Sequence, residues 1–200
     1  MIDYNQIIEA AKKYVFEQLK SDFSGHDYNH IMRVYNMAIF LAENYEVNQF
    51  IVAIAALLHD LDDYKIADKY SNKVVTFLKK HQVEESQEII DIINNMSFSS
   101  YKLGKNVNSM EGKIVQDADR LDALGAIGIA RCFAYSGAKS RSLYDNDKDG
   151  DSSIAHFYQK LLKLPSLMNT AEAKEIAYKR VDFMRLYLKN FFAEWEMGAK

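Results

Sequence analysis

The sequence contains few of the residues that interrupt helices or cross-link a chain. Its 200 residues include 1 proline, 8 glycines and 1 cysteine. With so few helix breakers, long helical segments are expected. The single cysteine, Cys132, excludes a disulfide within the chain and fits a reducing compartment. Because no signal-peptide pattern follows Met1 either, the expected location is the cytoplasm.

Long hydrophobic runs and a strong net charge are also missing. The longest apolar stretch, Phe50 to Leu58, is far too short to span a bilayer. The formal net charge of -3 gives no reason to expect non-specific binding to nucleic acid. We therefore expect no membrane and no nucleic-acid partner, but a small-molecule substrate and a monomer or homodimer.

Apolar residues recur at helical spacing through nearly the whole chain, and no segment alternates as a strand does. The pattern predicts an all-α, single-domain helical bundle over residues 1–200. Helices are expected near residues 7–19, 27–45, 48–59, 71–80, 84–96, 110–135, 152–164 and 170–197. The helix over residues 110–135 is expected to bend near Gly125 and Gly128. Pro165 is expected to end the helix over residues 152–164, and Thr170 to cap the helix over residues 170–197. Residues 137–151 are predicted to be a mobile polar loop, and residues 152–197 to supply the C-terminal helices.

The doublet His59-Asp60 ends the nearly all-apolar helix expected over residues 48–59. Burying an imidazole beside a carboxylate costs several kcal/mol unless something pairs with them. A divalent metal is the simplest compensation, and His30 and Asp119 lie on two other expected helices. Two imidazoles and two carboxylates suit Mn²⁺, Fe²⁺, Co²⁺, Ni²⁺ or Zn²⁺ better than Ca²⁺.

The order His…His-Asp…Asp on helices resembles the HD-domain metal-dependent phosphohydrolases. The segments HDYNHIMRV, LLHD and QDADRLDALGA together are similar to a subgroup of small stand-alone bacterial members, some of them nucleotide pyrophosphohydrolases. The resemblance is closest over residues 25–135, the expected HD core, with the metal site between core helices. It implies that His30, His59, Asp60 and Asp119 bind the metal.

Two neighbouring aspartates compete with Asp119 for the last ligand position. Asp117 and Asp122 lie close to it in the chain, but the family pattern A-D-x-L matches residues 118–121 and selects Asp119. Asp117 and Asp122 are then expected at the surface or beside the ligands. Members with two metals need further histidines before the last aspartate, and only His81 lies there. One ion is therefore expected, manganese in the first place, with magnesium, cobalt, nickel, iron or zinc as alternatives.

The resemblance and the spacing of charged residues around the expected ligands together imply catalytic and substrate-binding residues. Asp63, three residues after the doublet aspartate, would orient the attacking water or protonate the leaving group. Arg33 and Lys65 would bind the substrate and offset charge on its phosphoryl oxygens. His26 would bind the substrate or hold a ligand. For Asp63 and Lys65, a plain surface charge pair is the competing interpretation.

The expected activity is hydrolysis of a nucleoside triphosphate to the monophosphate and pyrophosphate by a metal-activated water. A nucleoside 5′-monophosphate phosphatase is the first alternative, and the product would separate the two. A signalling module that binds metal and nucleotide without turnover is the second.

Overall fold

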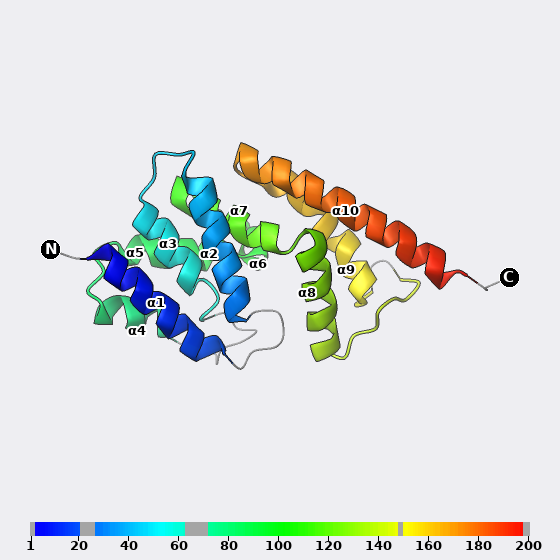
Figure 1. Ribbon diagram of the computed structural model, residues 1–200, viewed down its shortest axis with the longest axis horizontal. Coiled ribbons are helices and arrows are strands. Elements are labelled where there is room, and N and C mark those ends of the chain that lie inside the picture. Colours follow the sequence, from blue (N-terminus) through cyan, green and yellow to red (C-terminus); the bar gives the residue numbers. More distant parts are fainter. Residues whose placement is uncertain (1–2, 21–26, 63–71, 148–149, 198–200) are drawn as a thin grey trace. The chain divides into compact units, whose positions relative to one another are not determined.

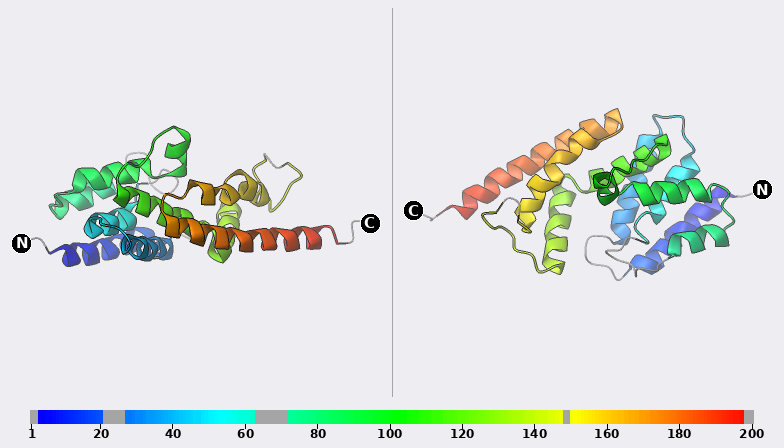
Figure 2. Two further views of the ribbon diagram at one scale, coloured as in Figure 1. Left: turned by 90° about the horizontal axis from the view of Figure 1, so that it is seen from above. Right: turned by 180° about the vertical axis from the view of Figure 1, so that it is seen from behind.

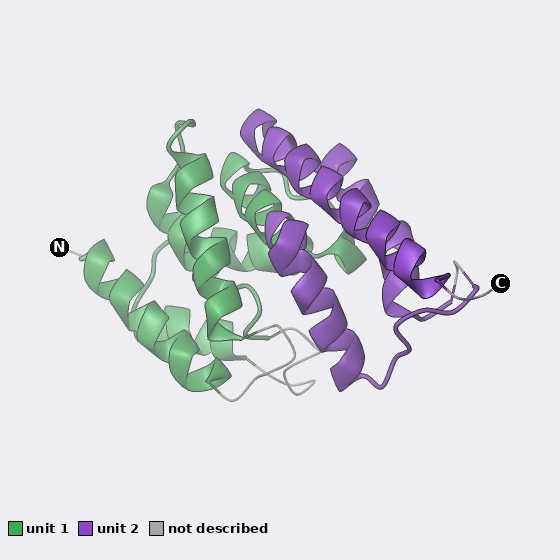
Figure 3. Cartoon of the chain, turned by 45° about the vertical axis from the view of Figure 1, so that its right-hand side comes forward, with its two compact units in different colours: residues 1–119 green, residues 120–200 purple. Residues whose placement is uncertain are grey.

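The computed structural model describes residues 3–20, 27–62, 72–147 and 150–197 (Figure 1). Every regular element within these ranges is a helix, which confirms the predicted all-α class. None of the helices in the described ranges is both long and apolar enough to cross a bilayer. The chain divides into two compact units, residues 1–119 and 120–200 (Figure 3). That residues 1–200 form one domain stays a prediction.

The first unit is built around a helix that has no solvent-facing side. Every residue of α3 (Gln49–Leu58) from Phe50 onward is buried. A helix that is apolar all round belongs in the core, as the sequence indicated. Figure 2 shows it from two further sides. It contacts α1 (Tyr4–Leu19), α2 (Tyr28–Ala42) and α5 (Ser86–Asn95), and α5 in turn contacts α4 (Lys73–Lys80) and α6 (Phe98–Lys102).

Short polar side chains begin the first three helices. Asp3, Asp27 and Asn48 each precede a helix and accept hydrogen bonds from its first free amides. Such caps satisfy amides that have no partner inside the helix. The backbone amide of Asn48 also donates to Glu111 Oε1, 2.9 Å away, in the first turn of α7 (Met110–Asp122). The start of α7 is thereby tied to the start of α3.

The prediction of one bent helix over residues 110–135 is wrong. α7 ends at Asp122, and a separate helix, α8 (Gly125–Ala138), begins after two residues. Gly125 has φ +73°, a conformation that favours glycine. At Gly128 a Cβ would lie 2.2 Å from the carbonyl oxygen of Ala123, so only glycine fits this close to the connection between the two helices. The glycines therefore mark a break in the helix rather than a bend.

The second unit packs its long C-terminal helix against two shorter elements, with a third beside them. α10 (Ala171–Trp195) contacts α8 and the 3₁₀ helix η1 (Leu161–Leu167), and α9 (Ser153–Gln159) contacts both η1 and α8. Thr170 caps α10 as predicted, accepting a bond from the Ala173 amide. Pro165 does not end the helix before it. That helix stops at Gln159, and Pro165 lies inside η1.

The polar segment predicted over residues 137–151 begins slightly later, because α8 continues to Ala138. Tyr144, within this segment, packs edge-on against three aromatic rings near the end of α10: Phe191, Phe192 and Trp195. Arg141 pairs with Asp151 at 3.1 Å. The predicted mobility of the segment stays a prediction.

Candidate metal centre

The first turn of α2 places His30. Asp27 is the cap of this helix, and its Oδ1 accepts a hydrogen bond from the His30 amide at 2.8 Å. The His30 side chain is completely buried. The cap fixes the backbone at His30, and burial restricts the direction of its imidazole in the core.

The turn after α3 places the doublet. His59 is the residue that ends α3, and its Nδ1 lies 2.9 Å from the carbonyl oxygen of Ala56. Since a carbonyl can only accept, Nδ1 carries the proton and Nε2 keeps a lone pair. This Nε2 is buried and makes no hydrogen bond to any described residue. A buried ring nitrogen in this state is the usual form of a metal-binding histidine.

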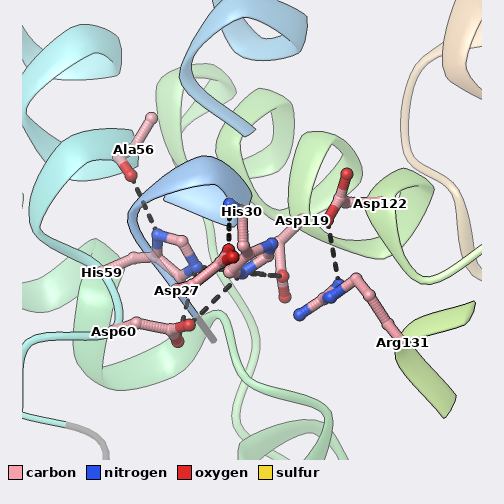
Figure 4. Close-up of polar contacts among 8 residues, drawn as sticks. All are labelled: Asp27, His30, Ala56, His59, Asp60, Asp119, Asp122 and Arg131. Atoms are coloured by element: carbon pink, nitrogen blue, oxygen red, sulfur yellow. Dashed lines mark hydrogen bonds and ion pairs between the residues drawn. The ribbon is translucent and has the colours of Figure 1, made fainter. Parts of the chain in front are cut away.

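The two carboxylates converge on the two imidazoles. His30 Nε2 lies 3.2 Å from Asp60 Oδ2 and 3.6 Å from Asp119 Oδ1. His59 Nε2 lies 3.4 Å from Asp60 Oδ1 and 3.8 Å from Asp119 Oδ1. The four side chains come from α2, the turn after α3, and α7, and Figure 4 shows them pointing toward one another.

These separations fit a single ion. Metal bonds of about 2.0–2.2 Å hold neighbouring donor atoms about 2.8–3.6 Å apart. Three of the four separations fall inside this range, and the distance from His59 to Asp119 lies just above it. The donors of His30, His59 and Asp60 all lie within 4.8 Å of one another, and all three residues are buried. A buried set of imidazole and carboxylate donors matches a divalent transition metal.

A further aspartate fastens the turn that carries the doublet. The Asp62 carboxylate accepts hydrogen bonds from the amides of Lys73 and Val74, at 2.9 and 3.0 Å. These are free amides in the first turn of α4, and Asn72 before them gives no side-chain cap. Asp62 therefore acts as the cap of α4 from eleven residues away. The sequence analysis missed this role because the partners are distant in the chain.

The predicted catalytic residues are only partly visible. His26, Asp63 and Lys65 lie outside the described residues. Arg33 is half-buried on α2, one turn after His30. Their predicted roles stay predictions.

The aspartates on either side of Asp119 are both buried, so a surface position is wrong for them. Asp122 pairs with Arg131 of α8, with 3.0 Å between its Oδ2 and Nη1. Arg120 donates a hydrogen bond to the carbonyl of Leu167. Arg131 was absent from the sequence-based site, since nothing in its local pattern distinguishes it.

The HD domain family profile matches residues 27–124 of this chain, which include all four donor residues. The protein YpgQ of Bacillus subtilis is 42% identical over 190 residues, covering 90% of each chain. The chain belongs to the HD-domain superfamily. Within it, the chain groups with the small stand-alone bacterial proteins that resemble YpgQ, as the motifs predicted.

Solved structures of similar proteins agree with this assignment. A Lactobacillus plantarum protein is 37% identical with a TM-score of 0.88, over 98% of this chain and 100% of its own. An HD-superfamily hydrolase from Bacillus thuringiensis is 46% identical with a TM-score of 0.77, over 97% of this chain and 99% of its own. YpgQ, in its crystal structure with ADP, is 36% identical in sequence to this chain, with a TM-score of 0.79 over 96% of each chain. This HD-domain chain is accordingly a metal-dependent phosphohydrolase.

Proposed function

We propose that this HD-domain protein hydrolyses nucleoside triphosphates to the monophosphate and pyrophosphate. The observation that carries the proposal is the ADP complex of YpgQ, a relative of the same length and fold. ADP presents a nucleoside and a phosphoanhydride together. In this chain, the buried donors of His30, His59 and Asp60, with Asp119 beside them, suit a phosphohydrolase acting on such bonds.

The proposed site binds one divalent ion, manganese in the first place, through His30, His59, Asp60 and Asp119. When bound, such an ion lowers the pKa of a water molecule and polarises a phosphoryl oxygen. The protein's part is to hold the donors. Ala56 keeps the proton of His59 on Nδ1, and Asp27 fixes the backbone at His30.

In the reaction that we propose, water attacks the α-phosphorus and a new P–O bond forms. The bond from that phosphorus to the bridging oxygen breaks, and pyrophosphate leaves with the electron pair. Asp63 would orient the water and take its proton, or protonate the leaving group. Arg33 and Lys65 would offset the negative charge that spreads over the phosphoryl oxygens. His26 would bind the substrate.

The test is a panel of nucleoside mono-, di- and triphosphates, incubated with Mn²⁺, Co²⁺ or Mg²⁺, with pyrophosphate and orthophosphate measured separately. Pyrophosphate in equal amount to the monophosphate supports the proposal. Orthophosphate released from monophosphates would instead identify a phosphomonoesterase. Nucleotide binding without any product at micromolar enzyme would identify a binding module.

Two variants connect the activity to the site. His59→Ala and Asp60→Ala are each expected to abolish Mn²⁺ binding and turnover together, because each removes a buried donor. His81→Gln is the matched control, since His81 lies at the end of α4 and packs against Phe77. It should leave both properties unchanged. Full activity in either alanine variant would overturn the metal assignment.

A further inference from the structure

Three of the four donor residues are held by burial, and the fourth is not. The side chains of His30, His59 and Asp60 are 0%, 3% and 10% exposed, whereas that of Asp119 is 34% exposed. With fewer atoms around it, the Asp119 carboxylate depends on its helix backbone for its position. Asp119 lies in the last turn of α7, where carbonyls lack partners inside the helix and ends fray.

Two arginines from other helices hold the end of α7. Arg131 of α8 pairs with Asp122 at 3.0 Å, and the two side chains are only 16% and 7% exposed. Arg180 of α10 donates from Nη1 to the carbonyl oxygen of Leu121, 2.6 Å away. One bond therefore fixes a side chain of the last turn. The other adds a second donor to the Leu121 carbonyl, which also accepts a hydrogen bond from the Leu124 amide at 3.0 Å. Because water is largely excluded from the pair of Arg131 and Asp122, each charge depends on the other for compensation, and both side chains must keep a precise geometry.

The side chain of Arg180 passes close to Gly125, the first residue of α8. A Cβ at Gly125 would lie 3.1 Å from Arg180 Cγ, so the glycine leaves room for the stem of the arginine. Burial lowers the pKa of Arg180, and the charge of Asp122 opposes that shift. The Asp122 carboxylate thus acts on two guanidinium groups, from α8 and from α10.

We propose that Asp122, Arg131 and Arg180 are positioning residues, which fix the last turn of α7 and so hold the Asp119 carboxylate in place for the metal. The inference rests on the proposed function, because it takes Asp119 as a ligand. Asp122 follows Asp119 by three residues on one continuous helix, and Figure 4 shows Arg131 on the Asp122 carboxylate. None of the three positioning residues supplies a donor to the ion itself.

The test measures Mn²⁺ binding to metal-free protein by electron paramagnetic resonance, without any substrate. Arg131→Met, Asp122→Asn and Arg180→Met are each expected to raise the Kd about tenfold, the lower end of what residues that orient metal ligands contribute. Arg131→Lys keeps the charge and should recover most of the affinity. Arg185→Met is the matched control, because it breaks an exposed pair with Asp182 on α10 and should leave the Kd unchanged. Circular dichroism identifies any variant that fails to fold, and Asp122→Asn and Arg131→Lys are the mildest of the set.

A double-mutant cycle separates positioning from general loosening of the protein. If Arg131 acts through Asp119, Arg131→Met should not weaken Mn²⁺ binding further once Asp119→Ala is present. A further tenfold loss in that background would overturn the inference, since it would mean that the remaining ligands are disturbed as well.

The same cycle distinguishes a failure of this inference from a failure of the proposed function. If Asp119→Ala weakens binding but the Asp122 and Arg131 variants do not, only the positioning role is wrong. If Asp119→Ala binds Mn²⁺ as the wild type does, Asp119 is not a ligand, and the proposed metal site and the positioning role are overturned together.

Discussion

Asp27 fixes His30 through the backbone: its Oδ1 accepts a hydrogen bond from the His30 amide at 2.8 Å. The bond caps α2 at the residue that carries the buried imidazole. Two roles are thereby combined in one carboxylate, since the cap stabilises the helix and also sets the direction of a predicted metal ligand.

Asp27→Ala should therefore change two properties. Loss of the cap is expected to lower the free energy of unfolding by about 1 kcal/mol, measured in urea. Because the first turn of α2 loosens, the Kd for Mn²⁺ should rise as well. Asp27→Ser keeps a capping oxygen and should restore both. A variant that loses stability but binds Mn²⁺ normally would show that the cap does not orient His30.

Metal binding should also be visible as thermal stability. An ion that binds only the folded state, at a hundred times its Kd, adds about 2.7 kcal/mol to the free energy of unfolding. For a chain of this length that corresponds to a rise of about 5–10 °C in Tm. Differential scanning fluorimetry after removal of metal by EDTA, with and without added Mn²⁺, measures the shift. Asp60→Asn should lose it, and a shift that persists in this variant would place the ion elsewhere.

Two glycines of α8 should respond in opposite ways to alanine. At Gly128 a Cβ would overlap the Ala123 carbonyl, so Gly128→Ala is expected to destabilise the protein by about 2–3 kcal/mol. Gly137 has no atom within 4 Å of its Cβ position, and Gly137→Ala should stabilise the helix by up to about 1 kcal/mol. Urea denaturation of both variants measures the contrast. Equal effects would contradict the close approach of Gly128 to the Ala123 carbonyl.

Much of this fold follows from the sequence, because apolar spacing reports which face of a helix is buried. The all-apolar character of residues 50–58 correctly predicted that α3 lies in the core. The order of His30, His59, Asp60 and Asp119 predicted two imidazoles whose Nε2 atoms the structure places within 3.8 Å of both carboxylates.

What the sequence could not predict are contacts between distant residues. The spacing around Gly125 and Gly128 fits a bent helix as well as a broken one. The choice is made by the Ala123 carbonyl and the stem of Arg180, whose positions depend on tertiary packing. Similarly, no local pattern links Asp62 to the start of α4 or Arg131 to the end of α7.

Cys132 should be nearly inert in the folded protein. Burial raises the pKa of its thiol to about 11, and its Sγ lies 3.7 Å from the Ser153 carbonyl oxygen. Because only the thiolate reacts, modification by a disulfide reagent at pH 8 should be slow until urea unfolds the chain. Cys132→Ala is the control without a thiol, since no other cysteine is present. Rapid modification without urea would show that α8 opens readily.

The same shift sets the pH range in which Cys132 affects stability. Its folded pKa is raised above the ordinary 9.0, so the folded state holds the proton more tightly than the unfolded state does. The resulting contribution is fully present below about pH 9 and is lost as the pH rises toward 11. Comparing urea midpoints of the wild type and Cys132→Ala across this range measures it.

The four donor residues are unevenly buried, so one side of the centre is closed by protein and the side of Asp119 is exposed to solvent. Both imidazoles face protein, and among the four donors only the carboxylate of Asp119 has substantial contact with solvent. An incoming ion, a water molecule or a phosphate group would therefore arrive on the Asp119 side, and a chelator would withdraw the ion along the same route. Asp119 would then control how fast the centre fills and empties, in addition to how tightly it binds.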